Sequence, residues 1–381
     1  MDENPSFEVN QPFLREKYQG IHSFHRISCK DKTGLNELQQ AISQALSEVE
    51  IIQTLWGQSW FEVKTTLENL SEHYVSHQEY KNLCQKNNIN QSAQNTLVQF
   101  LHDLGVIIHF KDFDLRDTYV LEPKWVTEAV YKIINAPQLA QHQGVLTLDC
   151  LDEILQPKTE HDYHYPVEKH RHIILLMEKF ELCYKINPET ILIPDLLAVP
   201  QPEFNFNYDT ALKFKLEYDF LPRSIMPKFI VKRHKDILNQ LHWRTGVVLY
   251  DKIYQTTAVI KSDNEDKNIQ IWVTRDDFAT IRKTLWELHD DFEKLDVIEL
   301  VPLPDKDKRG QAVYVEYEDL IGCYLDNKPY YNGKIRQEYK VRQLLDGIVD
   351  MQKPEQIMSQ NITINGDVKN SNINNADDVQ Q

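Results

Sequence analysis

The spacing of apolar residues changes near residue 204, and this change constrains the fold more than any other feature of the sequence. Before that point, apolar residues recur at helical spacing, which is typical of helices that bury one face. After it, residues 212–220 alternate between large apolar side chains and mostly charged ones, which is typical of a half-buried strand. Further strands are predicted at residues 246–250, 256–261, 269–274, 297–301 and 313–317. The chain is therefore predicted to be an α+β protein in which a helical part precedes an antiparallel sheet.

The second part of the chain also contains helices and ends in a polar tail. Helical spacing predicts helices at residues 228–241, 278–292 and 339–349. Residues 353–381 are rich in asparagine and poor in large apolar side chains, so we predict a disordered tail. Within the tail, residues 361–368 alternate like a single strand, and a strand that awaits a partner is the alternative interpretation.

Residues 49–203 predict a mainly helical domain with a short sheet. Helices are predicted at residues 59–70, after the capping box Ser76-His77-Gln78-Glu79, and at 92–104, 124–134 and 173–180, with strands at 106–110 and 119–121. Three helices followed by a two-stranded wing are typical of winged-helix domains, which usually bind DNA through a basic third helix. No Lys or Arg lies between Lys86 and Lys111, so this third helix cannot neutralise phosphates. We interpret the domain as a module for protein contacts, and a nucleic-acid binder is the weaker alternative.

The charge balance and the cysteines exclude several classes of protein. Asp and Glu number 58 against 42 Lys and Arg, a net charge of −16, which disfavours nucleic acid and anionic membranes as partners. No apolar run approaches the ~20 residues of a membrane span, and residues 1–30 lack a signal-peptide core. The five cysteines are scattered and form no CxxC pair. We therefore expect a cytoplasmic protein without disulfides or a zinc ribbon.

No catalytic motif is found. The sequence contains no GxxxxGKS/T, GxGxxG, GxSxG or HExxH. Four histidines gather in the segment HDYHYPVEKHRH, namely His161, His164, His170 and His172. Histidine is a common zinc ligand, but a loop that contains Pro166 does not fix the geometry of these side chains. We interpret the segment as an exposed polar loop before the helix at 173–180, and we expect neither catalytic residues nor a metal site.

The first 48 residues predict a helix at 11–18, a strand at 23–28 and a helix at 35–49. The loop between the strand and the second helix, Ser28-Cys29-Lys30-Asp31-Lys32-Thr33-Gly34, resembles the guanine-binding SAK loop of small GTPases. The resemblance implies that the backbone N–H of Cys29 faces guanine O6, and that Asp2 is the aspartate of the other base motif. The vestigial guanine contacts that it implies are Asp2, Ser28, Cys29 and Lys30.

Longer motifs resemble the Roco family, and bacterial members in particular. The segment YVLEPKWVTEAVY at 119–131 is similar to the signature of the COR domain, which follows the Roc GTPase domain in this family. The other similar segments are LHDLGVIIHF at 101–110, IPDLL at 193–197, WRTGVVL at 243–249, VPLP at 301–304 and YKVRQLLDG at 339–347. The resemblance covers about residues 1–350. It implies a remnant of a Ras-like α/β Roc domain at 1–48, COR-A at 49–203 and COR-B at 204–352.

The resemblance also implies a function, with one departure. In complete Roco proteins Roc hydrolyses GTP and COR-B mediates dimerisation, and some members carry a Ser/Thr kinase that is absent here. This sequence lacks the P-loop, the switches and the Asn-Lys of the base motif, so we expect no cofactor, neither GTP nor Mg²⁺. We expect a COR homodimerisation module for signalling that is not itself an enzyme. The alternative is the C-terminal part of a complete Roc-COR GTPase, from a gene model that starts too late, with nucleotide-linked dimerisation.

Two groups of residues are candidate interfaces. In the family the start of COR-B faces Roc, which implies an apolar patch of Phe220, Leu221, Pro222, Met226 and Phe229. Aromatic residues dominate interface energies, so the candidate anchors of a dimer are Trp243, Tyr250, Tyr254 and Trp272. For both groups the alternative is packing in the core. We also expect residues 1–34 to be loose, because the strand at 23–28 lacks the rest of its sheet, and the helix at 35–49 to dock on COR-A.

Overall fold

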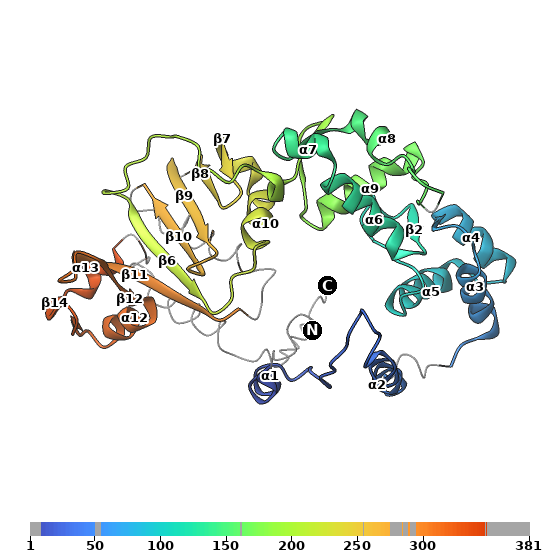
Figure 1. Ribbon diagram of the computed structural model, residues 1–381, viewed down its shortest axis with the longest axis horizontal. Helices are drawn as coiled ribbons and strands as arrows, with labels where there is room; N and C mark the ends of the chain where they lie inside the picture. The colour runs from blue at the N-terminus through green and yellow to red at the C-terminus, as the bar shows by residue number, and fades with distance from the viewer. Residues whose placement is uncertain are drawn as a thin grey trace, which may run out of the picture. The chain divides into compact units, whose positions relative to one another are not determined.

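The computed structural model describes residues 9–49, 55–160, 162–253, 255–274, 284, 289, 295–346 and 348. The chain divides into two compact units, and Figure 1 colours it from blue at the N-terminus to red at the C-terminus. The first unit comprises the residues up to Ala129 together with Arg171–Leu175, and the second comprises Val130–His170 and the residues from Leu176 onward. Asp2, His161, Tyr254, the predicted tail and nearly all of the predicted helix at 278–292 lie outside the described residues.

The first unit is mainly helical. Its elements are α1 (Gln11–Lys17), α2 (Leu35–Ser47), α3 (Gln58–Glu68), β1 (Tyr74–Ser76), α4 (His77–Lys86), α5 (Gln91–Asp103), β2 (Thr118–Val120) and the start of α6 (Pro123–Ile134). The strands β1 and β2 pair antiparallel. Apolar residues of α3, α4 and α5 form one buried cluster with Val75 of β1 and Tyr119 of β2.

Two helix ends in this unit carry clear caps, and the first is the predicted capping box. At the start of α4, the Ser76 hydroxyl accepts a hydrogen bond from the Glu79 N–H, and the Glu79 carboxylate accepts one from the Ser76 N–H. At the end of α5, Gly105 adopts φ +73°. The N–H of Val106 then reaches the carbonyl of Leu101 at 2.9 Å. This left-handed residue stops the helix and turns the chain toward β2.

Three expectations for the first unit are wrong. Residues 21–28 form no strand, because an extended segment becomes a strand only when another strand supplies its hydrogen bonds. Residues 106–110 contribute a single bridge, between Ile108 and Val120, in place of a full strand. The helix α2 has no buried residue, so the expected docking of its apolar face is not formed.

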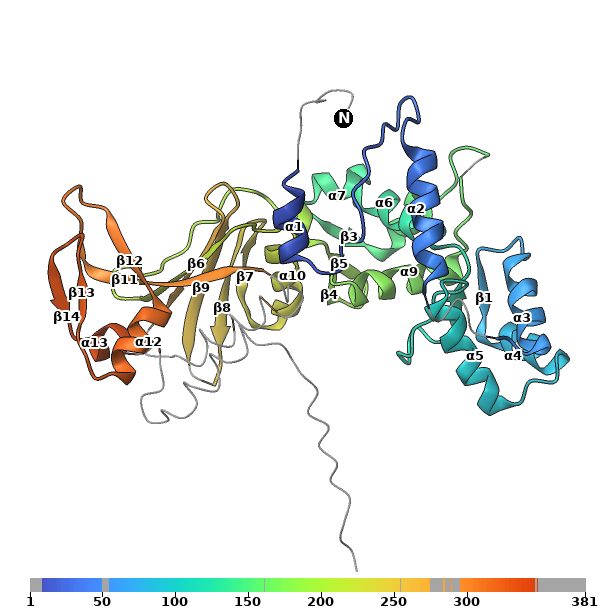
Figure 2. The ribbon, with the colours of Figure 1, turned by 90° about the horizontal axis from the view of Figure 1, so that it is seen from below.

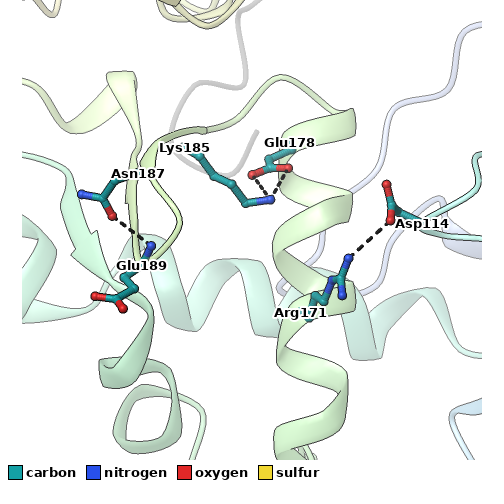
Figure 3. A network of polar contacts seen from close by, with 6 residues as sticks. All are labelled: Asp114, Arg171, Glu178, Lys185, Asn187 and Glu189. Carbon is teal, nitrogen blue, oxygen red and sulfur yellow. Dashed lines mark hydrogen bonds and ion pairs between the residues drawn. The ribbon is translucent and has the colours of Figure 1, made fainter.

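The second unit contains the two larger sheets. After α7 (Pro137–Gln141), β3 (Val145–Thr147), α8 (Leu151–Ile154) and α9 (Val167–Lys179), the strands β4 (Tyr184–Asn187) and β5 (Thr190–Leu192) complete an antiparallel sheet of order β3-β5-β4. The salt bridge between Lys185 of β4 and Glu178 of α9, at 3.1 Å, ties this sheet to the helix (Figure 3). In the next turn the Asn187 side chain accepts the N–H of Glu189 at 2.9 Å.

A seven-stranded antiparallel sheet follows, with the order β12-β11-β6-β10-β9-β8-β7. Its strands are β6 (Leu212–Tyr218), β7 (Ile237–Trp243), β8 (Gly246–Asp251), β9 (Thr256–Asp263), β10 (Asn268–Val273), β11 (Val297–Lys306) and β12 (Ala312–Glu316). The helices α10 (Ile225–Lys232) and α12 (Tyr317–Leu325), the hairpin of β13 (Tyr330–Asn332) and β14 (Gln337–Tyr339), and α13 (Val341–Leu345) complete the described part (Figure 2). The predicted strands at 212–220, 246–250, 256–261, 269–274, 297–301 and 313–317 are confirmed within a few residues.

The sheet has one strongly apolar face. Every second residue of its central strands, such as Phe214 on β6 and Ile271 on β10, enters one large core. The helix α10 packs on that face with six buried residues, and α12 adds Leu320 and Ile321. Burial of one face, with the opposite face of strands such as β6 less buried, explains why the alternating pattern is clear in the sequence.

Two helix predictions in the second unit are corrected. The predicted helix at 228–241 begins earlier and ends at Lys232, and residues 237–243 form β7 instead. Pro227 is tolerated because it lies in the first turn of α10, where its missing N–H would have no helical partner. The predicted helix at 339–349 is limited to α13, because residues 337–339 pair with β13.

Candidate functional site

The second face of the seven-stranded sheet carries a small aromatic cluster. Trp243, Val248 and Val259 are buried there, and the connecting segment before β6 packs over them with Phe204, Phe206 and Tyr208. The Trp243 ring lies against Gly246, so closely that a Cβ on this glycine would be 2.2 Å from Trp243 Cζ2. The connecting segment therefore covers the tryptophan, and the ring occupies the space that a side chain at residue 246 would need.

Beside this cluster, a lysine lies close to two aromatic rings. Lys261 Nζ is 4.8 Å from the ring centre of Tyr208 and 5.1 Å from that of Trp272. The two rings meet edge to face at 5.3 Å. Such cation–π and aromatic contacts hold the connecting segment on the sheet. Trp243 and Trp272, both predicted as dimer anchors, are thus engaged by the chain's own residues.

The predicted apolar patch is only partly exposed. Leu221, Met226 and Phe229 are at most 6% exposed and belong to the main core, because they lie at and just before the buried face of α10. Pro222 is half-buried, whereas Phe220 is 67% exposed. The five residues therefore do not form a continuous exposed patch, and only Phe220 is free to meet a partner without a rearrangement.

The turn between β8 and β9 exposes an apolar residue that the sequence analysis missed. Ile253 is 84% exposed, and its N–H is held at 2.8 Å by the Asp251 carboxylate. Tyr250, a predicted anchor, precedes it on β8 and is half-buried. Tyr254 lies outside the described residues. No periodicity distinguishes an exposed isoleucine at a turn from a core isoleucine, so no sequence pattern points to Ile253.

The loop that resembles a guanine site is closed by its own polar groups. Ser28 is buried, and its hydroxyl accepts the N–H of Asp31 at 3.3 Å. The N–H of Thr33 donates to the Asp31 carboxylate at 3.0 Å. This bond is the main cause that lowers the pKa of Asp31, and a hydrogen bond between the Ser28 side chain and the same carboxylate is the next. Cys29 and Lys30 are exposed at the loop tip. The structure thus places three of the four predicted base contacts in one ordered loop.

The histidine segment differs from the expected exposed loop. α9 begins at Val167, so His170 and His172 are helical, and both are buried. The ring of His170 contacts the Tyr165 carbonyl at 3.0 Å and the Asp152 carboxylate at 3.1 Å. Among the described residues, no group of three or more His, Cys, Asp or Glu is placed to hold a metal ion.

A pair of half-buried histidines beside Tyr119 is a second feature that the sequence analysis missed. The Tyr119 hydroxyl bonds to the ring of His77, and the ring of His109 packs on Tyr119 edge to face at 4.8 Å. Burial is the main cause that lowers the pKa of both histidines, with smaller contributions from nearby cations. Burial also raises the pKa of Tyr119 to about 12. Both rings are therefore neutral in the folded protein at neutral pH.

This pair predicts a loss of stability in mild acid. An unfolded histidine has a pKa of about 6.5, which is above that of His77 or His109 in the fold. Below pH ~6.5 the unfolded chain therefore binds more protons, and the free energy of unfolding falls as the pH drops. Urea midpoints measured from pH 8 to pH 5 should be constant above about pH 7 and should then decline. The variant His109→Leu should show a shallower decline, and an equal slope would contradict this assignment.

A continuous core joins the small sheet to the seven-stranded one within the second unit. Tyr184 of β4 and the ring of His234, after α10, stack at 4.7 Å. Arg244, in the turn between β7 and β8, donates its N–H to the Ala198 carbonyl at 2.9 Å and its side chain to the Leu197 carbonyl at 3.1 Å. Leu192 and Leu197 belong to the same buried cluster as Phe229. These contacts cross the predicted domain boundary at residue 203 and fix the two sheets to each other.

In the part of the chain that the structure describes, no helix is both long enough and apolar enough to span a lipid bilayer.

Two family models match the chain. The model described as C-terminal of Roc, COR-A domain, matches residues 57–197, and the one described as C-terminal of Roc, COR-B domain, matches residues 209–347. Together they account for most of the described residues.

Individual proteins are also similar. A Roc-COR-CHAT protease of Runella zeae is 28% identical over 314 residues, which cover 79% of this chain and 32% of that protein. A probable serine/threonine-protein kinase, pats1 of Dictyostelium discoideum, is 24% identical over 321 residues, which cover 75% of this chain and 10% of that protein. A solved structure of Methanosarcina barkeri Roco2 RocCORdC bound to GDP is 56% identical, covers 51% of this chain and 61% of that chain, and has a TM-score of 0.45. The chain thus spans about a third or less of these curated relatives.

Proposed function

Because the chain belongs to the Roco family and carries its COR-A and COR-B domains, we propose that it is an interaction module that forms a homodimer through COR-B. The dimer is isologous, so each copy presents the same surface to the other. Its only chemistry is binding. The catalytic functions that the names of its relatives state are functions of those proteins.

The observation that carries this proposal is the exposed turn between β8 and β9. Ile253 is 84% exposed there, although the Asp251 carboxylate fixes its backbone. Burial of an exposed isoleucine stabilises a complex by roughly 1.5–3 kcal/mol, and a backbone that is already hydrogen-bonded lowers the cost of ordering the turn on binding. Two-fold symmetry doubles this contribution. Tyr250 lies next to the turn and supplies an aromatic anchor for the same contact.

A charge at this turn should weaken the dimer. In the proposed dimer Ile253 of each copy is buried at the contact. The variant Ile253→Asp places a carboxylate there in both copies, and the two like charges repel each other across the two-fold axis, so we expect at least a tenfold weaker self-association. The matched control is Val167→Asp, at the first position of α9, where the side chain is 65% exposed and an acidic residue suits the helix start. Sedimentation equilibrium of both variants measures the effect. Equal self-association of Ile253→Asp and wild type would exclude this turn from the interface.

The other domains have supporting roles in this proposal. Residues 9–49 represent the end of a Roc domain, with Ser28, Cys29 and Lys30 in a vestigial base loop. COR-A presents a winged-helix-like group of α3, α4, α5, β1 and β2 for protein contacts, since α5 carries no Lys or Arg. Neither GTP nor Mg²⁺ is retained by these 381 residues, because no phosphate-binding loop occurs in them.

A second function follows if these residues belong to a larger protein. The chain spans 32% of the Runella protein that it resembles, and in such a protein a complete Roc domain would bind GTP. The continuous core between COR-A and COR-B would then transmit a movement of Roc to the dimer contact. This alternative predicts that dimerisation responds to nucleotide only when Roc is complete.

A further inference from the structure

Two hairpins near the end of COR-B carry a positive charge that contrasts with the rest of this acidic chain. Residues 305–309 and 331–342 contain seven Lys and Arg against three acidic residues, whereas the whole chain has a net charge of −16. All seven side chains are exposed. We call them the basic hairpin patch: Lys306, Lys308, Arg309, Lys334, Arg336, Lys340 and Arg342.

The two hairpins are neighbours in space. One joins β11 to β12 and the other joins β13 to β14, and they lie near each other in both views (Figure 1, Figure 2). The Tyr339 hydroxyl of β14 donates to the Asp305 carboxylate of β11 at 3.0 Å. Lys306 and Lys340 each follow one of these bonded residues, so the bond brings together cations from both hairpins.

Both turns are held rigid by a side chain of their own. In the first, the Asp307 carboxylate accepts the N–H groups of Arg309 and Gln311, each at 2.8 Å. In the second, the Asn332 side chain accepts the N–H groups of Lys334 at 3.0 Å and Ile335 at 3.1 Å. The cations at the tips therefore project from fixed backbones, which lowers the entropy that binding would cost.

Among the described residues, no salt bridge neutralises the cations of the patch. None of the seven cations forms a salt bridge with another described residue, whereas the nearby Lys328 pairs with Asp326 at 2.8 Å. Of the three acidic residues in these segments, Asp305 is bonded to Tyr339 and Asp307 faces its own turn. Tyr331, on the β13–β14 hairpin, is 60% exposed and adds an aromatic surface to this hairpin.

We propose that the basic hairpin patch binds a short acidic peptide segment of a partner protein. The size of the patch favours a short ligand, because electrostatic attraction fades beyond a Debye length of about 8 Å at physiological salt. A nucleic-acid duplex or a bilayer surface extends well beyond two hairpins and would meet the acidic remainder of the chain. This binding is independent of the proposed dimer.

The test is fluorescence anisotropy of fluorescein-labelled decaglutamate with the full chain at low salt. Reversing two charges in Lys334→Glu with Arg336→Glu should weaken binding about tenfold or more, since each close ion pair contributes up to about 1 kcal/mol. Lys306→Glu with Lys308→Glu, on the other hairpin, should have a similar effect. The matched control, Lys235→Glu with Lys267→Glu, makes the same charge change at exposed turns of the same domain and should weaken binding less than about threefold.

Three outcomes would overturn the proposal. The first is no binding of decaglutamate by the wild type at low salt. The second is an equal loss of affinity in the control variant, which would indicate a response to net charge alone. The third is tighter, patch-dependent binding of single-stranded DNA or of phosphatidylserine vesicles, which would replace the acidic peptide by that ligand.

The melting temperature of each variant checks that it is folded. Because the four substituted side chains in each comparison are exposed, the melting temperature of every variant should stay near that of the wild type.

Discussion

Replacing Gly246 by alanine is expected to lower the free energy of unfolding by about 3 kcal/mol. The added Cβ would be 2.2 Å and 2.6 Å from two atoms of the Trp243 ring and 2.7 Å from the Ile260 carbonyl oxygen. The backbone carbonyl cannot retreat within a central strand pair, so the tryptophan must move. When the ring moves, Val248 and Val259 become exposed. The cost of this exposure adds to the cost of the steric clash. Urea unfolding measures the loss, and the tryptophan fluorescence should shift to the red.

A second glycine provides the matched control. Gly322 lies in α12, and a Cβ there would meet nothing within 4 Å. Gly322→Ala should therefore leave stability unchanged or raise it by up to about 1 kcal/mol, because alanine favours a helix. If Gly246→Ala proved as stable as Gly322→Ala, the close contact between Gly246 and Trp243 would be wrong.

The variant Phe229→Ala is expected to lose about 3–5 kcal/mol, the usual cost of emptying a buried phenylalanine site. Phe229 is 1% exposed and lies in the core shared by α10, the seven-stranded sheet and the small sheet. Thermal and urea unfolding of the full chain measure this loss. An interface role would instead weaken self-association while leaving the stability of each copy intact.

Phe220→Ala is the control for this prediction. The side chain is 67% exposed and lies nine residues before Phe229, so its removal should change stability by less than about 0.5 kcal/mol. Equal effects of the two substitutions would contradict the assignment of Phe229 to the core and of Phe220 to the surface.

The sequence predicts strands such as β6, β10 and β12 well because one face of each is more deeply buried than the other. Phe214 and Leu216, for example, alternate with lysines that lie on the opposite face. The strand β7 breaks this rule. Asn239 and Gln240 both adopt positive φ, at 47° and 58°, and shift the register between Ile237 and His242. The bulge disturbs the alternation, so residues 237–243 could be mistaken for the continuation of a helix.

Which side chains stay exposed is less predictable, because a sheet face can be covered by a segment that is distant in the sequence. Trp243 and Trp272 were reasonable anchors from composition alone, but Phe204, Phe206 and Tyr208 cover that face. No local pattern reports such a contact. The half-buried histidines show the same limit, since His77 and His109 meet at Tyr119 only after α4 and β2 are placed together.

The molar mass in solution tests the central claim, that this chain is a COR module which dimerises without a nucleotide. Light scattering of the full chain at tens of micromolar should give about twice the single-chain mass of 45.0 kDa, with and without added GTP. A mass near 45.0 kDa at this concentration, or a dimer that forms only when GTP is present, would contradict the account.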